Sequence, residues 1–430
     1  MQTFRPAPPH RSSATTSRLR PMPPVPRRHP GLEARQTPAE AACSVRHATA
    51  LANALERPIT PGNRVDALID APSAYAAMLD AIEAARDHIN IESHLVEADG
   101  PARELARRLL AKRREGVRVN LLLGGMDPDG TCSRYFTALR KAGVHLCEYR
   151  PPSVWRNPLG HALHARQHRK LLIVDGRVAI TGGLDGSSIY PVPSQALGTG
   201  GDSPARDTHV RLEGPVVATL QRLFLDHWCS QSRSAAQRAR YFPPLAAAGE
   251  QQVAVAACDD HHRHHPSLHV LLRAVESAEQ RIWLTADCFA PPRRLLRALA
   301  SAARRGVDVR LVLPGGGKSA LWPVHRGHYA ELLAAGVRIF ERREALPQAQ
   351  TAVIDGVWST LGAGKLDWRS VLHTAEANVV VLDPTFGARL EEVFRQDLFC
   401  SHEVLPTEWR ERGWHARASE WLAARLDFLP

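Results

Sequence analysis

The sequence predicts an α/β fold made of two tandem copies of one unit, each a mixed β-sheet flanked by helices. Three observations support this fold class. The chain has 430 residues, a length that accommodates two or three domains of ordinary size. Four blocks of sequence recur in the same order in its two halves. Within each copy, segments with helical spacing of apolar residues alternate with short β-branched segments, as in strands packed against helices.

The repeated blocks define the expected elements in chain order: a helix end with a strand, a basic helix with a strand, a helix with a Gly turn and a strand, and a hairpin. The four pairs of blocks are AIEAARDHINI and AVESAEQRIWL, LLAKRREGVRVNLLL and ALASAARRGVDVRLVL, YFTALRKAGVHLCEY and HYAELLAAGVRIFER, and LLIVDGRVAITGG and TAVIDGVWSTLGA. We therefore expect a basic tail at 1–57, a first lobe at 58–235, a linker at 236–265, a second lobe at 266–405 and a C-terminal amphipathic helix at 406–430.

Composition limits the class of protein. The formal net charge is +11, and six arginines that precede the first acidic residue, Glu33, supply more than half of it. Eight prolines share that stretch, so we predict that the tail is mostly disordered. It is either a basic arm for anionic lipid or nucleic acid or a solvated tail, and we favour the tail. The seven scattered cysteines indicate a reducing compartment, and no run approaches the roughly 18 apolar residues of a membrane span.

One motif in the first copy can carry chemistry. His168 and Lys170 lie two apart where a strand enters a buried apolar run, so both side chains share a face. An imidazole can attack phosphorus while an ammonium neutralises the phosphoryl oxygens. Asp175 begins a tight turn and is expected to orient the pair. Gly182 and Gly183 offer bare backbone amides that can approach a phosphate closely.

The string HRKLLIVDGRVAITGGLD resembles the H-x-K-x4-D signature of the phospholipase D superfamily, and most closely that of bacterial cardiolipin synthases. The resemblance covers nearly all of the chain after residue 60, including ARDTHVRLEGPVV, LTADCFAP and DGVWSTLGAGKLDWRS. It implies two phospholipase D-like lobes related by a pseudo-twofold axis. It further implies that one histidine forms a phosphohistidine while the other protonates the leaving alcohol, with no metal or other cofactor.

The second copy departs from the signature. Asp355 aligns with the aspartate of the first motif, and this register places Gln348 and Gln350 where the family has His and Lys. Glutamine forms hydrogen bonds but does not titrate, so it cannot replace a general acid, a role worth about 10²–10⁴-fold in rate. The sequence therefore predicts one intact half-site facing a neutral, polar half-site.

The loops after both motifs also differ from the family pattern. Gly183 and Asp185 stand where Ser and Asn are usual in the first copy, and Ala363 and Lys365 occupy those positions in the second. We expect Gly183, Asp185 and Lys365 to face the substrate.

Each copy keeps a carboxylate on a later strand, Asp207 in the first copy and Glu376 in the second. The resemblance implies that each carboxylate holds the histidine of the other lobe. Glu376 would then orient His168, while Asp207 has lost its partner. A strand-edge salt bridge is the alternative for both, and for Asp207 the two interpretations are evenly balanced.

Three outcomes remain open for the altered second motif. The enzyme turns over with help from water, Lys365 or a nearby histidine (His325, His328 or His373). It stalls at a phosphohistidine or turns over very slowly. Or it is a pseudoenzyme that binds phospholipid head groups.

Other motifs are weaker. The histidine-rich stretch AACDDHHRHHPSLH and the trio His161, His164 and His168 lack regular metal-ligand spacing, so we expect no metal. GGGKS fails the P-loop pattern because Val312 stands where its first glycine belongs. The aromatic C-terminus is either an interfacial helix or packs on the second lobe.

The sequence thus predicts a cytoplasmic phosphatidyltransferase, peripheral at the inner membrane face, whose partner is a phosphatidylglycerol-type phospholipid. In this prediction His168 is the nucleophile, Lys170 the phosphate clamp, and Asp175 and Glu376 the supporting groups. A phosphodiesterase acting on nucleic acid is the second enzymatic possibility. Outside the tail the chain is only mildly basic, so we do not expect nucleic acid as the partner.

Overall fold

We describe the protein from a computed structural model of the full chain. The structure describes residues 37–55, 57–93, 100–124, 131–149, 166–167, 169–183, 206–232, 238–258, 265–315, 326–342, 349–362, 364, 366–367 and 374–413. Residues 1–36 lie outside the described ranges. The remainder of the chain, from Thr37 onward, is one unit by its internal contacts.

Both copies contain the same succession of main helices and strands. The first copy comprises β1 (Thr60–Ile69), α2 (Asp70–Ala84), β2 (His88–Ser93), α3 (Gly100–Arg114), β3 (Arg118–Leu123), α4 (Thr131–Lys141), β4 (His145–Glu148), β5 (Arg166–Gln167), β6 (Leu171–Val174), β7 (Val178–Gly182), β8 (Thr208–Glu213) and α5 (Val216–Ser232). The second comprises β9 (Gln251–Cys258), α6 (Pro266–Ser277), β10 (Arg281–Thr285), β11 (Phe289–Ala290), α7 (Arg293–Arg304), β12 (Asp308–Pro314), α9 (Tyr329–Ala334), β13 (Arg338–Arg342), β14 (Thr351–Ile354), β15 (Trp358–Gly362), β16 (Leu366–Asp367), β17 (Thr374–Leu382) and α11 (Pro384–Phe399). The copies differ in the two-residue strands β5, β11 and β16.

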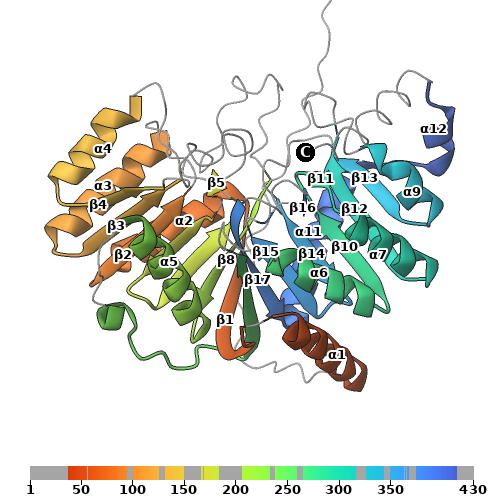
Figure 1. The fold of residues 1–430 in the computed structure, drawn as a ribbon, viewed down its shortest axis with the longest axis horizontal. Coiled ribbons are helices and arrows are strands. Elements are labelled where there is room, and N and C mark those ends of the chain that lie inside the picture. The colour runs from red at the N-terminus through yellow and green to blue at the C-terminus, as the bar shows by residue number, and fades with distance from the viewer. Residues whose placement is uncertain are drawn as a thin grey trace, which may run out of the picture. The chain divides into compact units, whose positions relative to one another are not determined.

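The strands of both copies join in one sheet, which has 16 strands among the described residues. Its order in the first copy is β1-β8-β7-β6-β2-β3-β4, and the corresponding order β9-β17-β15-β14-β10-β12-β13 recurs in the second copy. The short β18 (Ser401–Glu403) adds an antiparallel edge beside β13. The two halves meet where β1 pairs with β9 in antiparallel fashion (Figure 1). The predicted fold class, two mixed sheets flanked by helices and related by a repeat, is confirmed.

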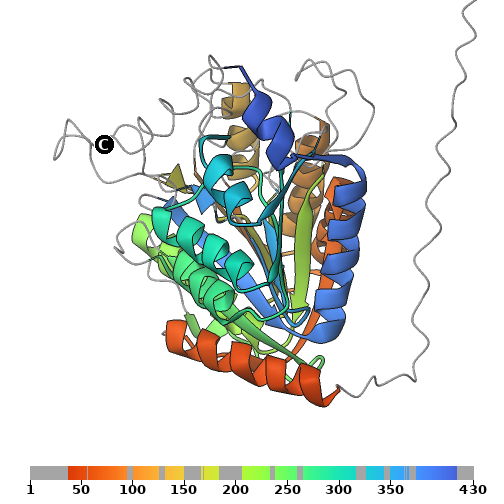
Figure 2. The same ribbon diagram turned by 90° about the vertical axis from the view of Figure 1, so that its right-hand side faces the viewer.

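Helices cover both faces of this sheet. In the second copy, α6, α7 and α9 enclose one apolar cluster, and α11 lies on the opposite face (Figure 2). In the first copy, α2, α3 and α4 enclose an equivalent cluster. A further cluster contains residues of α5 and α11 together with strands of both copies. Because this cluster is shared, burial of apolar surface stabilises the two copies against each other as well as within themselves.

The hydrophobic pattern accounts for the central strands. β2, β3 and β4 run parallel, as do β10, β12 and β13. Parallel strands covered on both faces need near-continuous apolar runs, and VNLLL and VRLVL are such runs, each interrupted by one polar residue, Asn120 or Arg310. The next two strands form a hairpin, β6–β7 or β14–β15, closed by an Asp-Gly pair with positive φ at both residues, the geometry of a type I′ turn.

The prediction that residues 1–57 form a mostly disordered tail is wrong for the last third of that segment. Residues Pro38–Ala54 form helix α1, which packs against α6 of the second copy (Figure 1). Thr37 and Glu40 make a capping box at its start, an arrangement that satisfies two backbone donors at once. Proline and arginine are concentrated before this segment, which is instead rich in alanine and buries Leu51.

The predicted linker at 236–265 is also wrong in part. It contains β9, whose alternating valines and alanines are buried between β17 and β1. At the C-terminus the described part of the expected helix is short, α12 (Pro406–Glu411). Its Trp409 is buried against Tyr329 with Arg412 over its ring, which favours packing over a membrane contact there. Trp414, Trp421 and Phe428 lie outside the described residues.

A buried ionic cluster also links the copies. Arg206, just before β8, donates from Nε to Asp397 Oδ1 of α11 at 2.9 Å. Arg342 at the end of β13 donates to the same carboxylate oxygen. Removal of one member of such a group leaves an uncompensated buried charge and is strongly destabilising. The cluster therefore fixes α11 relative to the first copy's β8.

Candidate functional site

Lys170 is held at the end of the β6–β7 hairpin. Its side chain is buried, and Nζ donates to the carbonyl oxygen of Gly183 at 2.7 Å. Its own carbonyl accepts from Thr181 Oγ1 at 2.7 Å. Two predicted site residues, Lys170 and Gly183, are thereby brought together. The contact uses the glycine carbonyl, which orients the ammonium.

His168 lies outside the described residues, but the residue before it is placed by strand pairing. β5 runs parallel to β17, with Gln167 opposite Ala375. Ala375 directly precedes Glu376. The chain therefore approaches position 168 alongside the strand that carries Glu376.

The residue after His168 makes a second contact in the same region. Arg169 is almost fully buried and donates from Nη2 to the carbonyl oxygen of Cys258 at 2.6 Å. Cys258 is the register partner of Glu376 in the β9–β17 pair. Both neighbours of His168 thus contact the second copy next to Glu376, whose side chain is itself buried.

Asp207, the carboxylate that the first copy retains, is fully buried at the start of β8. Its Oδ1 accepts from the amide of Thr208 at 2.6 Å. Burial raises the pKa of Asp207 to about 7, although this hydrogen bond and the charges of Lys170 and Arg206 oppose the rise. A raised carboxyl pKa means that nearby cations and donors do not fully compensate the loss of solvent.

Gly182 packs directly against His209, and its predicted approach to phosphate through the backbone amide stays a prediction. A Cβ at Gly182 would lie 2.5 Å from the ring of His209, which fills the space above the glycine. His209 is buried, and burial together with the charge of Lys170 lowers its pKa to about 3. The imidazole is therefore neutral beside Lys170 at physiological pH.

The second copy places Gln350 where the first has Lys170. Gln350 is buried, and its Nε2 donates to Asp287 Oδ1 at 2.5 Å. An ionised carboxylate only accepts hydrogen bonds, so this contact sets the orientation of the amide. Gln350 therefore lies beside a carboxylate, and the neutral character of the half-site stays a prediction. Gln348, Lys365 and Asp185 lie outside the described residues, and their roles stay predictions.

Glu376 and Asn378 line the same end of the second copy. The amide of Gly364 donates to Asn378 Oδ1 at 2.9 Å. A Cβ at Gly364 would lie 2.9 Å from Glu376 Oε2, so the backbone passes very close to the carboxylate. A larger residue at Gly364 would displace Glu376.

The two motif aspartates serve the fold, and this corrects the expectation that Asp175 orients the histidine and lysine. The Asp175 carboxylate accepts three backbone amides of residues 86–88, each at 2.8 Å. All of β6 separates it from Lys170. Asp355 accepts the amides of residues 279–281 in the equivalent manner. Asp175 therefore fixes the turn that leads into β2, and Asp355 fixes the turn that leads into β10.

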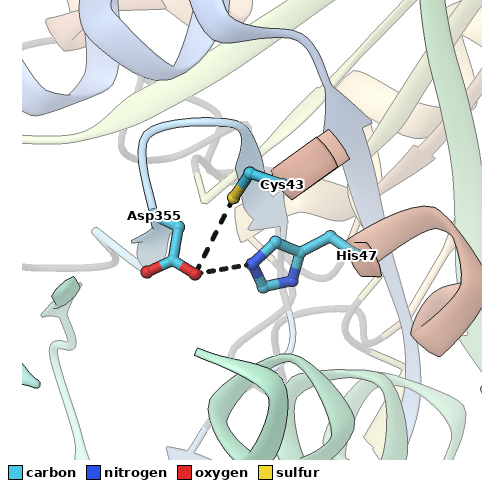
Figure 3. Close-up of side chains that lie close together, drawn as sticks. All are labelled: Cys43, His47 and Asp355. Carbon is cyan, nitrogen blue, oxygen red and sulfur yellow. Dashed lines mark hydrogen bonds and ion pairs between the residues drawn. The ribbon is translucent and has the colours of Figure 1, made fainter. Parts of the chain in front are cut away.

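Helix α1 adds further groups to Asp355 (Figure 3). His47 Nε2 lies 3.0 Å and Cys43 Sγ 3.9 Å from its Oδ2, and the three potential ligand atoms lie within 4.8 Å of one another. Burial alone would raise the pKa of Asp355, but hydrogen bonds from His47 and the backbone amides hold it well below its ordinary value.

A metal ion does not fit this cluster well. Arg46 Nη2 lies 3.1 Å from Asp355 Oδ2 and 3.3 Å from Cys43 Sγ, so a guanidinium already occupies the cationic position. Burial and the charge of Asp355 raise the pKa of Cys43 to about 11, whereas a metal ligand must be a thiolate. The cluster is an ion-pair anchor that fastens α1 to the second motif.

Of the histidines proposed as rescuers, His328 is the one that the structure describes. It is buried at the start of α9, where burial lowers its pKa and the charged groups that affect it are Glu331 and Arg293. Among the described contacts, none joins it to Gln350. His325 and His373 lie outside the described residues.

The sequence reasoning missed several polar side chains at the site: Thr285, Asp287, His209 and Asn378. The repeat contains a usable signal for two of them. His209 and Asn378 each lie two residues after the retained carboxylate, so strand periodicity places them on the same face as that carboxylate. Asp287 lies two residues after the end of β10, and LTADCFAP already belonged to the resemblance.

Comparison with known proteins identifies the family of this chain. The family model described as cardiolipin synthase, PLD-like domain, matches residues 78–187 and again residues 271–398, more than half of the chain. The chain belongs to this family. The two matches coincide with the two structural copies. Family and relatives together support a phosphatidyltransferase-type enzyme.

Two curated relatives illustrate the similarity. Cardiolipin synthase from Halalkalibacterium halodurans is 27% identical over 367 residues, which cover 84% of this chain and 71% of the relative. Cardiolipin synthase A from Pseudomonas fluorescens is 30% identical over 366 residues, which cover 82% and 72%.

Solved structures confirm the fold of this cardiolipin synthase-like protein. Phosphatidylserine synthase from Haemophilus influenzae superposes with a TM-score of 0.66 at 11% identity, covering 89% of this chain and 98% of that chain. Polyphosphate kinase from Porphyromonas gingivalis has a TM-score of 0.52 at 12% identity, covering 84% and 52%. Among the helices described in our structure, none is both long and apolar enough to cross a membrane.

Proposed function

We propose that this protein transfers a phosphatidyl group from a phosphatidylglycerol-type lipid to the hydroxyl of a second glycerol-type alcohol. The observation that carries the proposal is the docking of the first motif on the second copy. Gln167 and Arg169, which flank His168, contact β17 and β9 beside Glu376. The curated relatives that share most of the chain are cardiolipin synthases.

The reaction proceeds in two displacements. In the first, an imidazole nitrogen of His168 attacks phosphorus, the phosphorus–oxygen bond to the head group breaks, and glycerol leaves with a proton. In the second, the hydroxyl of the acceptor lipid attacks the phosphohistidine, loses its proton and releases His168. The sum is two phosphatidylglycerol molecules converted to one cardiolipin and one glycerol.

Three side chains share this work. Lys170 neutralises the phosphoryl oxygens, because a fixed cation stabilises charge that increases in the transition state. Glu376 orients His168, as a buried carboxylate orients the imidazole of other nucleophilic sites. Neither Gln350 nor Gln348 can protonate the leaving glycerol, so we propose that water performs this step and that turnover is slow.

A second candidate, a pseudoenzyme that binds phospholipid head groups, has one observation in its favour. Gln350 is anchored to Asp287 by a 2.5 Å hydrogen bond and carries no titratable proton. In this version the first motif binds phosphate without turnover. In either version the protein acts as a peripheral protein at the inner face of the membrane.

The test is product analysis with purified full-length protein and vesicles of labelled phosphatidylglycerol. The proposal expects cardiolipin and free glycerol from the wild type and neither from His168→Ala. Lys170→Gln should lower the rate by about 10²–10³-fold, since one charge-stabilising group is lost. The matched controls are the exposed His402→Ala and Lys141→Gln, which should retain the wild-type rate. If the wild type bound the vesicles but formed no product, the result would contradict the enzyme and favour the pseudoenzyme.

A further inference from the structure

Three residues of the first copy form one row across the sheet at the site. In the β6–β7 pair Leu171 lies opposite Thr181, so the position before Leu171 places Lys170 opposite Gly182. In the β7–β8 pair Gly182 lies opposite His209. Residues directly opposite each other in antiparallel strands direct their side chains to the same face. Lys170 and His209 therefore share a face, and the residue between them has no side chain to separate them.

The imidazole of His209 occupies the middle of this row. A Cβ at Gly182 would lie 2.5 Å from Cγ and Cδ2 of the ring, so the ring fills the space that a side chain would take. Both His209 and Lys170 are buried. Burial, and after it the charge of Lys170, lowers the pKa of His209 to about 3. A neutral ring therefore packs beside the ammonium at physiological pH.

The same contact affects the acceptor of the lysine. Gly183 directly follows the glycine on which the ring packs, and its carbonyl oxygen accepts from Lys170 Nζ at 2.7 Å. An ammonium carries three N–H donors, and the bond to this carbonyl sets the direction of the others. Because the lysine stem is flexible, that direction depends on where the carbonyl is held. A displaced ring would release Gly182, and the carbonyl of the next residue would move with it.

We propose that His209 is a positioning residue for Lys170. Its ring holds Gly182 at the end of β7, so that the carbonyl of Gly183 directs the ammonium toward the phosphoryl oxygens. His209 does not touch the substrate in this inference and acts only through the lysine. The inference rests on the proposed function only for the role of Lys170 at phosphate.

The second copy repeats the row with two amide side chains. The β14–β15 and β15–β17 registers place Gln350 opposite Gly362, and Gly362 opposite Asn378. Asn378 also holds the backbone beyond this glycine, because its Oδ1 accepts from the amide of Gly364 at 2.9 Å. In both copies, therefore, the residue two positions after the retained carboxylate supports the backbone beside the motif side chain. The copy with a lysine has an imidazole there, and the copy with a glutamine has an amide.

A double-mutant cycle with purified full-length protein and phosphatidylglycerol vesicles tests this role. His209→Asn introduces the residue that the second copy has at this position, and we expect kcat to fall by about 10-fold with little change in KM. In the Lys170→Gln background the same substitution should change kcat by less than about 2-fold, since residues that act through one group are not additive. The exposed His402→Asn is the matched control and should retain the wild-type rate. Equal losses in both backgrounds would indicate a merely structural role and overturn the inference.

A second measurement does not need turnover, so it separates failure of this inference from failure of the proposed function. Brief acetylation with acetic anhydride, followed by mass spectrometry, reports how firmly Lys170 is held, with the exposed Lys141 as internal standard. We expect slow acetylation of Lys170 in the wild type and a several-fold faster reaction in His209→Asn. If His209→Asn does not fold, Gly182→Ala replaces it, because the added methyl group would displace the ring. Unchanged acetylation of Lys170 in the folded variant would overturn the inference.

Discussion

The guanidinium of Arg169 donates a 2.6 Å hydrogen bond to the carbonyl of Cys258, the residue paired with Glu376 across β9 and β17. The contact joins the first motif to the second copy at the carboxylate that the sequence singled out. A nearly fully buried guanidinium is stable only when it is hydrogen-bonded. The interface between the copies is therefore built to hold the first motif in place, whatever the second motif has lost.

Glu376 should control the reactivity of His168. Glu376→Gln keeps the side-chain shape but removes the charge that stabilises an imidazolium, and we expect kcat for phosphatidyl transfer to fall by about 10²–10⁴-fold. Because Glu376 supports the histidine and does not clamp phosphate, KM should change little. Steady-state kinetics on vesicles measures both values.

The control for this experiment is Glu392→Gln, an exposed glutamate on α11. Equal kinetics for Glu376→Gln and Glu392→Gln would show that Glu376 has no part in the reaction.

Restoring the second motif should accelerate turnover. In Gln348→His with Gln350→Lys, the lysine can pair with Asp287, whose Oδ1 lies 2.5 Å from Gln350 Nε2 in the present structure. The new histidine supplies the missing general acid, a gain of about 10²–10⁴-fold if protonation of the leaving alcohol limits the rate. A double variant no faster than Gln350→Lys alone would show that another step is limiting.

Asp207 makes the stability of the protein depend on pH. Its pKa is raised to about 7 by burial, so the unfolded chain ionises at lower pH than the folded protein. Stability contributed by the protonated carboxyl is complete below the ordinary carboxyl pKa and is lost as the pH rises to about 7. Asp207→Asn, which can still accept from Thr208, should gain stability over the wild type across this range, by roughly 4 kcal/mol at most.

Denaturant unfolding of the two proteins at pH 5 and pH 8 measures this difference. A gap between variant and wild type that does not widen from pH 5 to pH 8 would contradict the raised pKa.

Asp355 should have the opposite pH dependence. Its pKa is held well below its ordinary value, against burial, by His47 and three backbone amides. The stabilisation is present above the ordinary carboxyl pKa and is lost as the pH falls below it. Asp355→Asn should cost about 3 kcal/mol at pH 7, because Arg46 and His47 then lose a buried counter-charge.

Thermal or denaturant unfolding at pH 7 and pH 2 tests this, with the exposed Asp226→Asn as the matched control. A cost that is equal at both pH values would assign Asp355 a role unrelated to its charge.

The sequence was sufficient for the elements that a repeat and an apolar pattern encode. Local signals predict the parallel strands and the Asp-Gly hairpins. They also predict the alignment of the two motifs, in which Gln350 takes the position of Lys170. Helix α1 and strand β9 were missed because alanine-rich segments have a weak apolar pattern and depend on tertiary partners, α6 for the helix and β17 for the strand. Composition of the surrounding residues obscured both.

The roles of individual site residues were harder to predict for the same reason. Asp175 stands in the signature beside His168 and Lys170, yet its carboxylate bonds to amides 86–88, distant in sequence. Asp287 is decisive for Gln350 but comes from the segment between β10 and β11, distant in sequence. Such contacts arise only when the sheet assembles, so a motif identifies residues without assigning their work.

The central claim is that the first motif alone carries the reacting group, on His168. The most direct measurement is mass spectrometry of peptides from protein quenched during turnover of phosphatidylglycerol. We expect a phosphatidyl adduct on the peptide that contains His168, absent in His168→Ala and retained in the Gln350→Leu variant. Cardiolipin formed by His168→Ala, or an adduct on any other residue, would contradict it.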